Sequence, residues 1–144
     1  MIVAESAGDL LLSRLMLNLN EPCRITDTSW IQPMRYIGIW WTYHMKHNTW
    51  HAGPHHGATT ENTMRHIDFA AANNLGGVLV EGWNEDWATW KFSFTKPYTD
   101  FDIQRITDYG RSKGVALIGH HETGGNVSNY ENEMEEGVKS HQKY

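Results

Sequence analysis

The stretch "GVLVEGW", from Gly77 to Trp83, is the middle one of three similar segments that decide the fold. The other two are "YIGIWW", from Tyr36 to Trp41, and "VALIGHHE", from Val115 to Glu122. Each segment is short, almost continuously apolar, and rich in β-branched or aromatic residues. Apolar runs without alternation are typical of strands covered on both faces, as in parallel sheets. The sequence therefore predicts three parallel strands.

Helical patterns lie between and after these segments. Apolar residues recur at spacings of three and four within residues 64–71 and again within 103–110, and Gly114 is placed to end the second helix. A third pattern of this kind follows Asn126, a residue type that often caps a helix. The order β-α-β-α-β-α predicts a parallel sheet with right-handed crossovers.

The first 35 residues differ from the rest. The stretch "DLLLSRLMLNLNEP" fits either a helix or an apolar strand, and "CRITDTSWIQP" has the composition of an extended linker. The three predicted βα units occupy residues 36–144, whereas a complete eight-fold barrel needs roughly 250 residues. Two explanations fit this length: a small open α/β sheet, or a fragment of a barrel.

Composition excludes several classes of protein. A chain of 144 residues is long enough for one domain with a core, and its net charge of -5 gives no general attraction to nucleic acid or anionic membranes. No apolar run reaches the roughly 18 residues of a membrane span. Cys23 is the single cysteine, so an intrachain disulfide and a thiolate metal cluster are excluded. The N-terminal residues lack the basic leader of a signal peptide.

Long connections follow the first two predicted strands, at Thr42–Thr59 and Gly82–Phe101. Long loops at the carboxyl ends of parallel strands are where α/β proteins place their sites. Glu81 and Glu122 follow neighbouring strands, so we expect their carboxylates to lie close together. Paired carboxylates among tryptophans indicate glycoside hydrolysis. In the competing interpretation the two glutamates only cap their strands or bind backbone amides.

Histidines and tryptophans leave further alternatives open. The histidines that could converge near the strand ends are His44, His47, His51, His55, His56, His120 and His121. Such a cluster suits a metal-dependent hydrolase, although its spacing matches no established zinc pattern. Exposure, or hydrogen bonding to substrate, is the alternative for these side chains. Trp83, Trp87 and Trp90 fit equally well a sugar-stacking platform, as in a non-catalytic carbohydrate-binding module, and the small core of their own loop.

Several stretches, in order, closely resemble the catalytic region of glycoside hydrolase family 97. They are "DTSWIQPMRYIGIWW", "HGATTENTMRHIDFAAANNLGGVLVEGWN", "FSFTKPYTDFD" and "LIGHHETGGNVSNYE". Upstream, "AGDLLLSRLMLNLNEPCRI" resembles the segment that leaves the N-terminal β-sandwich of that family. The resemblance implies an α/β fold that is part of a (β/α)8 TIM barrel. Residues 1–28 would be the tail of the sandwich domain and a linker, and residues 29–144 the N-terminal part of the catalytic barrel.

The same resemblance implies an exo-acting α-glucosidase that hydrolyses α-linked oligosaccharides or glucosides, and a glutamate at position 122 favours the inverting branch of the family. A retaining α-galactosidase of the same family is the alternative. Glu122 matches the general base that activates water. Trp40, Glu81 and His120 match substrate-binding residues. Glu81 and Glu122 would then not be the acid–base pair that their spacing suggests.

The resemblance also implies that much of the catalytic apparatus lies on later strands. The general acid and the calcium-binding glutamates of the barrel are expected on those strands, and a further calcium ligand is expected in the sandwich domain. This fragment alone is therefore expected to be inactive without the missing barrel strands. The family is typical of the periplasm or exterior of polysaccharide-degrading bacteria, and we expect that location for the parent enzyme.

Overall fold

A computed structural model of the chain describes residues 3–87, 89, 92–122 and 127–143. The chain divides into two compact units, Met1–Pro33 and Met34–Tyr144. The assignment of residues 1–28 to a sandwich domain and of 29–144 to the barrel stays a prediction.

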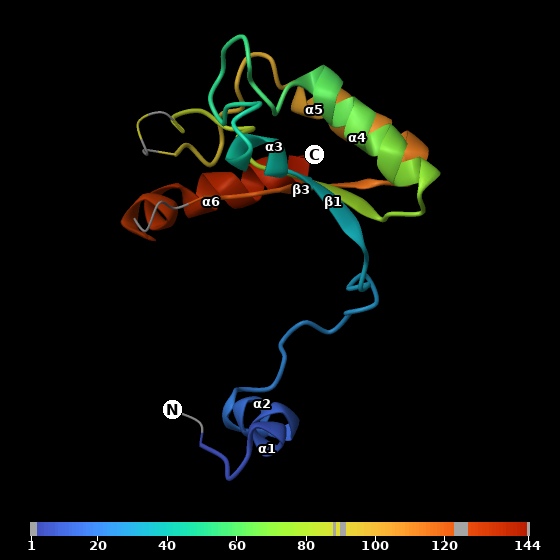
Figure 1. Ribbon diagram of the computed structural model, residues 1–144. Helices are drawn as coiled ribbons and strands as arrows, with labels where there is room; N and C mark the ends of the chain where they lie inside the picture. Colours follow the sequence, from blue (N-terminus) through green and yellow to red (C-terminus); the bar gives the residue numbers. More distant parts are fainter. Residues whose placement is uncertain (1–2, 88, 90–91, 123–126, 144) are drawn as a thin grey trace. The chain divides into compact units, whose positions relative to one another are not determined.

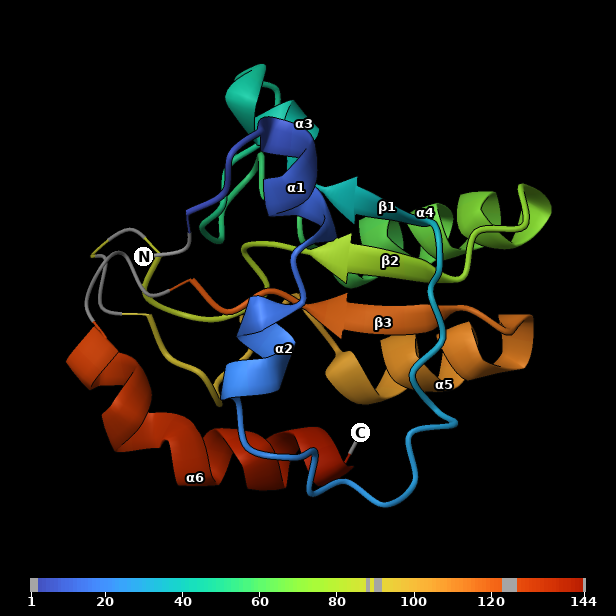
Figure 2. The same cartoon turned by 90° about the horizontal axis from the view of Figure 1, so that it is seen from below.

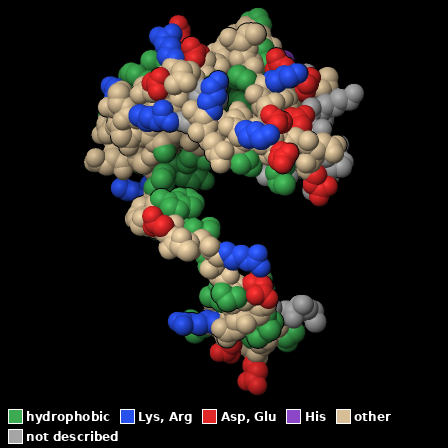
Figure 3. Space-filling model, turned by 180° about the vertical axis from the view of Figure 1, so that it is seen from behind, with side chains coloured by type: hydrophobic (Ala, Val, Ile, Leu, Met, Phe, Trp, Pro, Cys, Tyr) green, Lys and Arg blue, Asp and Glu red, His purple; other side chains and the backbone are tan. Residues whose placement is uncertain are grey.

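The first unit contains two short helices, α1 (Ala7–Leu12) and α2 (Leu15–Leu19), so the helical alternative for its leucine-rich stretch is the one observed. The Ser6 hydroxyl accepts a hydrogen bond from the Asp9 amide and so caps α1. Every described residue of this unit is exposed, and hydrophobic side chains lie on its surface (Figure 3). The unit therefore has no core of its own among its described residues.

The second unit is built on a three-stranded parallel sheet in the order β1-β2-β3. Its strands are β1 (Tyr36–Ile39), β2 (Gly77–Val80) and β3 (Ala116–Gly119). The three predicted parallel strands are confirmed (Figure 1). Each strand ends before the polar and aromatic residues that close the corresponding sequence segment. These residues therefore follow the carboxyl ends of the strands.

Helices α4 (Thr60–Ala72) and α5 (Ile103–Lys113) cover the same face of this sheet (Figure 2). The side chains of Thr59 and Asp102 cap their N-termini, and Gly114 ends α5 in a left-handed conformation, as predicted. Consecutive right-handed crossovers that continue in one direction place all helices on one face, as in a barrel, whereas a doubly wound sheet carries helices on both faces. The fold is accordingly part of a (β/α)8 barrel.

Two further helices complete the second unit. Helix α3 (Trp41–His44) directly follows β1 and was not predicted, because four residues are too few to show a period. Helix α6 (Val127–Lys143) agrees with the third helical pattern, although its predicted cap, Asn126, lies outside the described residues. Among the described residues, no helix has the length and apolar content that crossing a membrane requires.

The core lies between the sheet and its two covering helices. Val78 and Val80 of β2 are fully buried there against Ile67 of α4 and Ile106 of α5. The prediction that all strands are covered on both faces holds for β2 only. In β1, for example, Tyr36 is 53% exposed, because it alternates with Ile37 and Ile39 and therefore lies on the face that α4 and α5 do not cover.

Candidate active site

The predicted site residues come together at the carboxyl edge of the sheet. The register aligns Ile39 with Val80, and Val80 with Gly119. The residue that follows each of these is Trp40, Glu81 or His120, and Glu122 stands two positions beyond His120. Because the strands are parallel, all four residues lie at the same edge, where barrel enzymes place their chemistry.

Trp40 folds back over β1 because position 38 is a glycine. A Cβ atom at Gly38 would stand 2.6 Å from the indole Nε1 of Trp40, so a larger residue would displace the ring. The ring also makes edge contacts with Trp41 at 5.2 Å and with His44 at 5.5 Å between centroids. Trp40 is 37% exposed, so it presents a partly accessible apolar surface beside the strand ends.

Glu81 is held by the connection that follows β1. Its carboxylate Oε2 accepts a hydrogen bond of 2.9 Å from the indole Nε1 of Trp50, and its carbonyl oxygen accepts one of 2.9 Å from the hydroxyl of Tyr43. Glu81 is half-buried. A carboxylate anchored in this way keeps a defined direction, which a residue that merely caps a strand would not need.

Tyr43 acts as a neutral donor in this arrangement. It is 2% exposed, and its ring packs against Trp50 at 4.7 Å. Burial, and to a smaller extent the negative charge of Glu81, raises the pKa of Tyr43 above its ordinary value. The phenol consequently keeps its proton and its hydrogen bond to Glu81.

His120 and Glu122 lie just beyond the carboxyl end of β3. The Nε2 atom of His120 lies 3.8 Å from the Oε2 atom of Glu122, and the two side chains are 32% and 36% exposed. The backbone of His120 is fixed from two sides, because its amide donates to Val80 and its carbonyl accepts from the indole of Trp83 at 2.8 Å. Solvent can therefore reach the carboxylate of Glu122, and two hydrogen bonds hold the backbone of His120 beside it.

The histidines separate instead of converging. His121 stacks on Phe94 at 5.1 Å, and its ring also lies 5.7 Å from Trp83. His56 is buried and bonds to Asp100. Within the described part of the chain, no three His, Cys, Asp or Glu residues are grouped so that they could hold a metal ion. The described residues thus fit neither the metal-hydrolase alternative nor a calcium site, and we derive no step through a metal.

The tryptophans of the second long connection serve the interior of the loop. Trp83 is 4% exposed and packs against Phe101. Trp87 is half-buried, stacks on Trp50 at 6.1 Å with an interplanar angle of 8°, and donates to Asn84. For these two residues the structure favours a loop core over a sugar platform. Trp90 lies outside the described residues.

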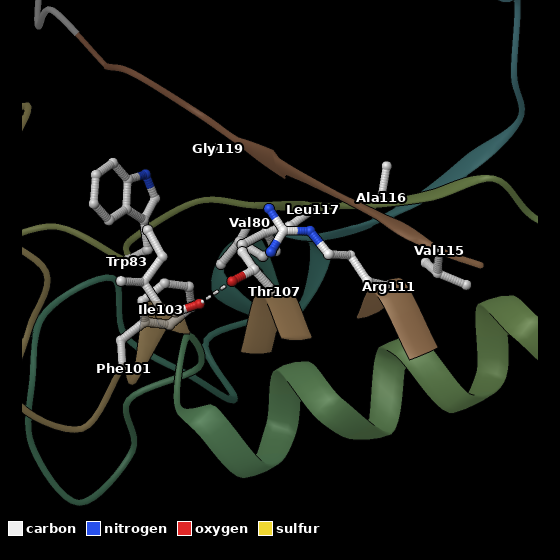
Figure 4. A pocket seen from close by; sticks show the side chains of 10 residues that line it. All are labelled: Val80, Trp83, Phe101, Ile103, Thr107, Arg111, Val115, Ala116, Leu117 and Gly119. Atoms are coloured by element: carbon white, nitrogen blue, oxygen red, sulfur yellow. Dashed lines mark hydrogen bonds between the residues drawn. The ribbon is translucent and has the colours of Figure 1, made fainter. Parts of the chain in front are cut away.

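A separate pocket of about 320 Å³ lies between α5 and β3 (Figure 4). Its lining is Val80, Trp83, Phe101, Ile103, Thr107, Arg111, Val115, Ala116, Leu117 and Gly119. None of the four predicted site residues lines it. The pocket is a mostly apolar gap beside the edge strand β3, and it does not belong to the strand-end site.

Sequence reasoning missed the residues that support the site. Tyr43, Trp50 and Asp100 were not singled out, although Tyr43 and Trp50 belong to a connection whose length already indicated function. Their partners are 31 to 44 positions away in the chain, and no local pattern encodes such a pairing.

Comparisons with known proteins agree with this architecture. The model of the family "Glycoside hydrolase 97" matches residues 40–144. The "Retaining alpha-galactosidase" of Bacteroides thetaiotaomicron is 30% identical over 121 residues, which cover 81% of this chain and 17% of that protein.

Solved structures give a closer match. A glycoside hydrolase family 97 enzyme from Pseudoalteromonas sp. strain K8, in complex with acarbose, is 51% identical and superposes with a TM-score of 0.87. The match covers 97% of this chain and 22% of that enzyme. A glutamate-to-glutamine variant in complex with panose matches with the same identity, coverage and TM-score. This chain therefore spans about a fifth of the length of these relatives. On the family match and the structural similarity together, the chain belongs to glycoside hydrolase family 97.

Proposed function

We propose that this chain supplies the first part of the catalytic barrel of an exo-acting α-glucosidase that inverts the anomeric centre. The observation that carries the proposal is the alignment of Trp40, Glu81 and His120 after three adjacent parallel strands, with Glu122 beside His120. Since the chain spans only about a fifth of its relatives, the activity is that of the full-length protein.

Each residue has a distinct role in this proposal. Glu122 is the general base, which takes a proton from the water that attacks the anomeric carbon. In an inverting enzyme the acid and the base stand roughly 6.5–9.5 Å apart to leave room for that water. His120 and Trp40 contact the sugar. Glu81, anchored through Oε2 by Trp50, binds sugar hydroxyls through its other oxygen.

The relatives support different substrates. The relative at 51% identity is in complex with acarbose and, as a variant, with panose, an oligosaccharide of α-linked glucose. The relative at 30% identity is a retaining α-galactosidase, which makes retaining α-galactoside hydrolysis the second candidate. The higher identity favours the α-glucosidase. Parallel assays on nitrophenyl α-glucoside and α-galactoside, with the anomer of the first product read by proton NMR, distinguish the two.

The decisive variant is Glu122→Gln in the full-length protein. It preserves size and removes the base, so kcat should fall by about 10²–10⁴-fold while the melting temperature changes little. Glu131→Gln, on the exposed surface of α6, is the matched control and should retain normal turnover. Near-normal turnover of Glu122→Gln would remove this residue from the mechanism. Sugar binding by the wild type without any hydrolysis would instead support a carbohydrate-binding module.

Calcium dependence and a periplasmic or extracellular location belong to the same proposal. The ligands of the ion would come from outside the described residues, which offer no suitable group. Treatment with a calcium chelator should abolish activity, and added calcium should restore it. Activity that survives chelation would refute the dependence, and activity confined to the cytoplasm after cell fractionation would refute the location.

A further inference from the structure

His56 is a buried histidine that the proposed catalytic roles do not use. Its side chain is 0% exposed, and both ring nitrogens have partners. The Nδ1 atom lies 2.7 Å from the Oδ2 atom of Asp100, and the Nε2 atom lies 2.9 Å from the carbonyl oxygen of Gly82. The edge of the ring packs against Tyr98 at 5.1 Å. His56 thus joins the end of the first long connection to the second.

The partners of His56 determine where its protons lie. A carbonyl oxygen can only accept, so the Nε2 atom must carry a proton and donate it to Gly82. The Nδ1 atom faces the Oδ2 atom of Asp100 at 2.7 Å, and this contact fixes the orientation of the ring. The bond to Gly82 is therefore held in one direction.

Gly82 connects the hydrogen bond of His56 to the site residue Glu81. It follows Glu81 directly and has a φ of +73°, which side chains rarely adopt. A Cβ atom there would stand 2.7 Å from the carbonyl oxygen of Trp50. The turn after β2 is consequently held between His56 on its carbonyl and the backbone of Trp50, whose indole also anchors the carboxylate of Glu81.

We propose that His56 and Asp100 form a positioning pair that directs Glu81 toward the sugar by fixing the Gly82 carbonyl. Neither residue touches the substrate in this proposal. The inference rests on the proposed role of Glu81 as a sugar-binding residue. The position of the Glu81 carboxylate matters because a displacement of about 1 Å can cost about a hundredfold in rate.

Two substitutions of His56 in the full-length protein test the proposal by kinetics. His56→Phe keeps a ring but loses both ring nitrogens, and it should raise the KM for an α-glucoside about tenfold or more. His56→Gln keeps a donor that can reach Gly82 and should recover most of the loss. His66→Phe is the matched control, because His66 is half-buried on α4 and bonds to the Asn62 carbonyl within the same helix, away from the Gly82 turn. Its KM should not change.

A purely structural role predicts a different pattern. It would reduce the fraction of folded molecules, so the specific activity would fall while KM stayed unchanged. The two His56 variants would then not differ in KM as predicted. That result would overturn the proposal. Coupling gives a further check: if His56 acts through Glu81, then His56→Phe should have little additional effect on KM in a Glu81→Gln background. Fully additive effects would count against the pair.

A structural readout separates this inference from the proposed function. If the wild-type protein hydrolyses no α-glycoside, the proposed function fails, but crystal structures of the variants still test the positioning. In His56→Phe, the distance from Trp50 Nε1 to Glu81 Oε2, now 2.9 Å, should exceed hydrogen-bond range, about 3.5 Å. In His56→Gln it should stay close to its present value. An unmoved Glu81 carboxylate in His56→Phe would refute the positioning role.

Discussion

The hydrogen bond between Trp50 and Glu81 offers a direct test of how the site is built. Trp50→Phe in the full-length protein removes the indole N–H that donates to the Glu81 carboxylate at 2.9 Å. It leaves an aromatic ring in the stack with Trp87 and against Tyr43. The substitution therefore isolates one hydrogen bond from most of the surrounding packing.

The expected size of the effect follows from the surroundings of the bond. Hydrogen bonds to charged groups contribute about 1.5–3 kcal/mol. Glu81 is only half-buried, so water can replace part of the lost interaction and the lower end applies. Without this anchor, sugar binding must itself order the Glu81 carboxylate, at a cost of up to about 1.5 kcal/mol. That cost corresponds to roughly a tenfold fall in kcat/KM, since each 1.36 kcal/mol is a factor of ten. The smaller ring also weakens the stack on Trp87, which a control must measure.

Trp87→Phe is that control. It makes the same change of volume in the same stacked pair, but the Trp87 indole donates to Asn84 and not to Glu81. Steady-state kinetics of both variants on an α-glucoside should show the tenfold loss for Trp50→Phe and a clearly smaller loss for Trp87→Phe. Equal losses would show that packing, and not the bond to Glu81, explains the effect, and the reasoning about the anchored carboxylate would be wrong.

Two further predictions concern the same turn. Gly82→Ala should lower the melting temperature of the full-length protein more than Gly114→Ala. Both positions have a left-handed φ, but of these two only at Gly82 would a Cβ atom meet backbone, the Trp50 carbonyl oxygen at 2.7 Å. Equal decreases in melting temperature would contradict this collision. Because burial raises the pKa of Tyr43, its contribution to stability is fully present below a pH of about 10 and is lost as the pH rises toward the folded-state value. The alkaline fall in melting temperature should therefore be shallower in Tyr43→Phe than in the wild type or in a variant of the exposed Tyr36. An unchanged slope in Tyr43→Phe would refute this role of Tyr43.

Local patterns were sufficient to predict the elements of the second unit. Apolar runs predicted the three strands, helical spacing predicted α4, α5 and α6, and Gly114 marked the end of α5. These features depend on residues within a few positions of each other, so they can be read along the chain. The placement of Glu81 and Glu122 at strand ends followed for the same reason.

The partners of those residues could not be predicted in this way. Spacing placed Glu81 and Glu122 after neighbouring strands, but it did not indicate that the Glu81 carboxylate accepts from Trp50 or that Glu122 stands beside His120. Nothing local distinguishes His56, which is buried between two connections, from the exposed histidines of the same loop.

The sequence by itself determined the parallel strands, their order along the chain and the residues that stand where each strand ends. Only the tertiary structure decided which of these residues are held and by what. The physical reason is that a strand or helix is selected by neighbouring residues, whereas the direction of Glu81 depends on Trp50, on Tyr43 and on the Gly82 turn that His56 holds. Those contacts exist only after the sheet has brought the two long connections together over the same edge.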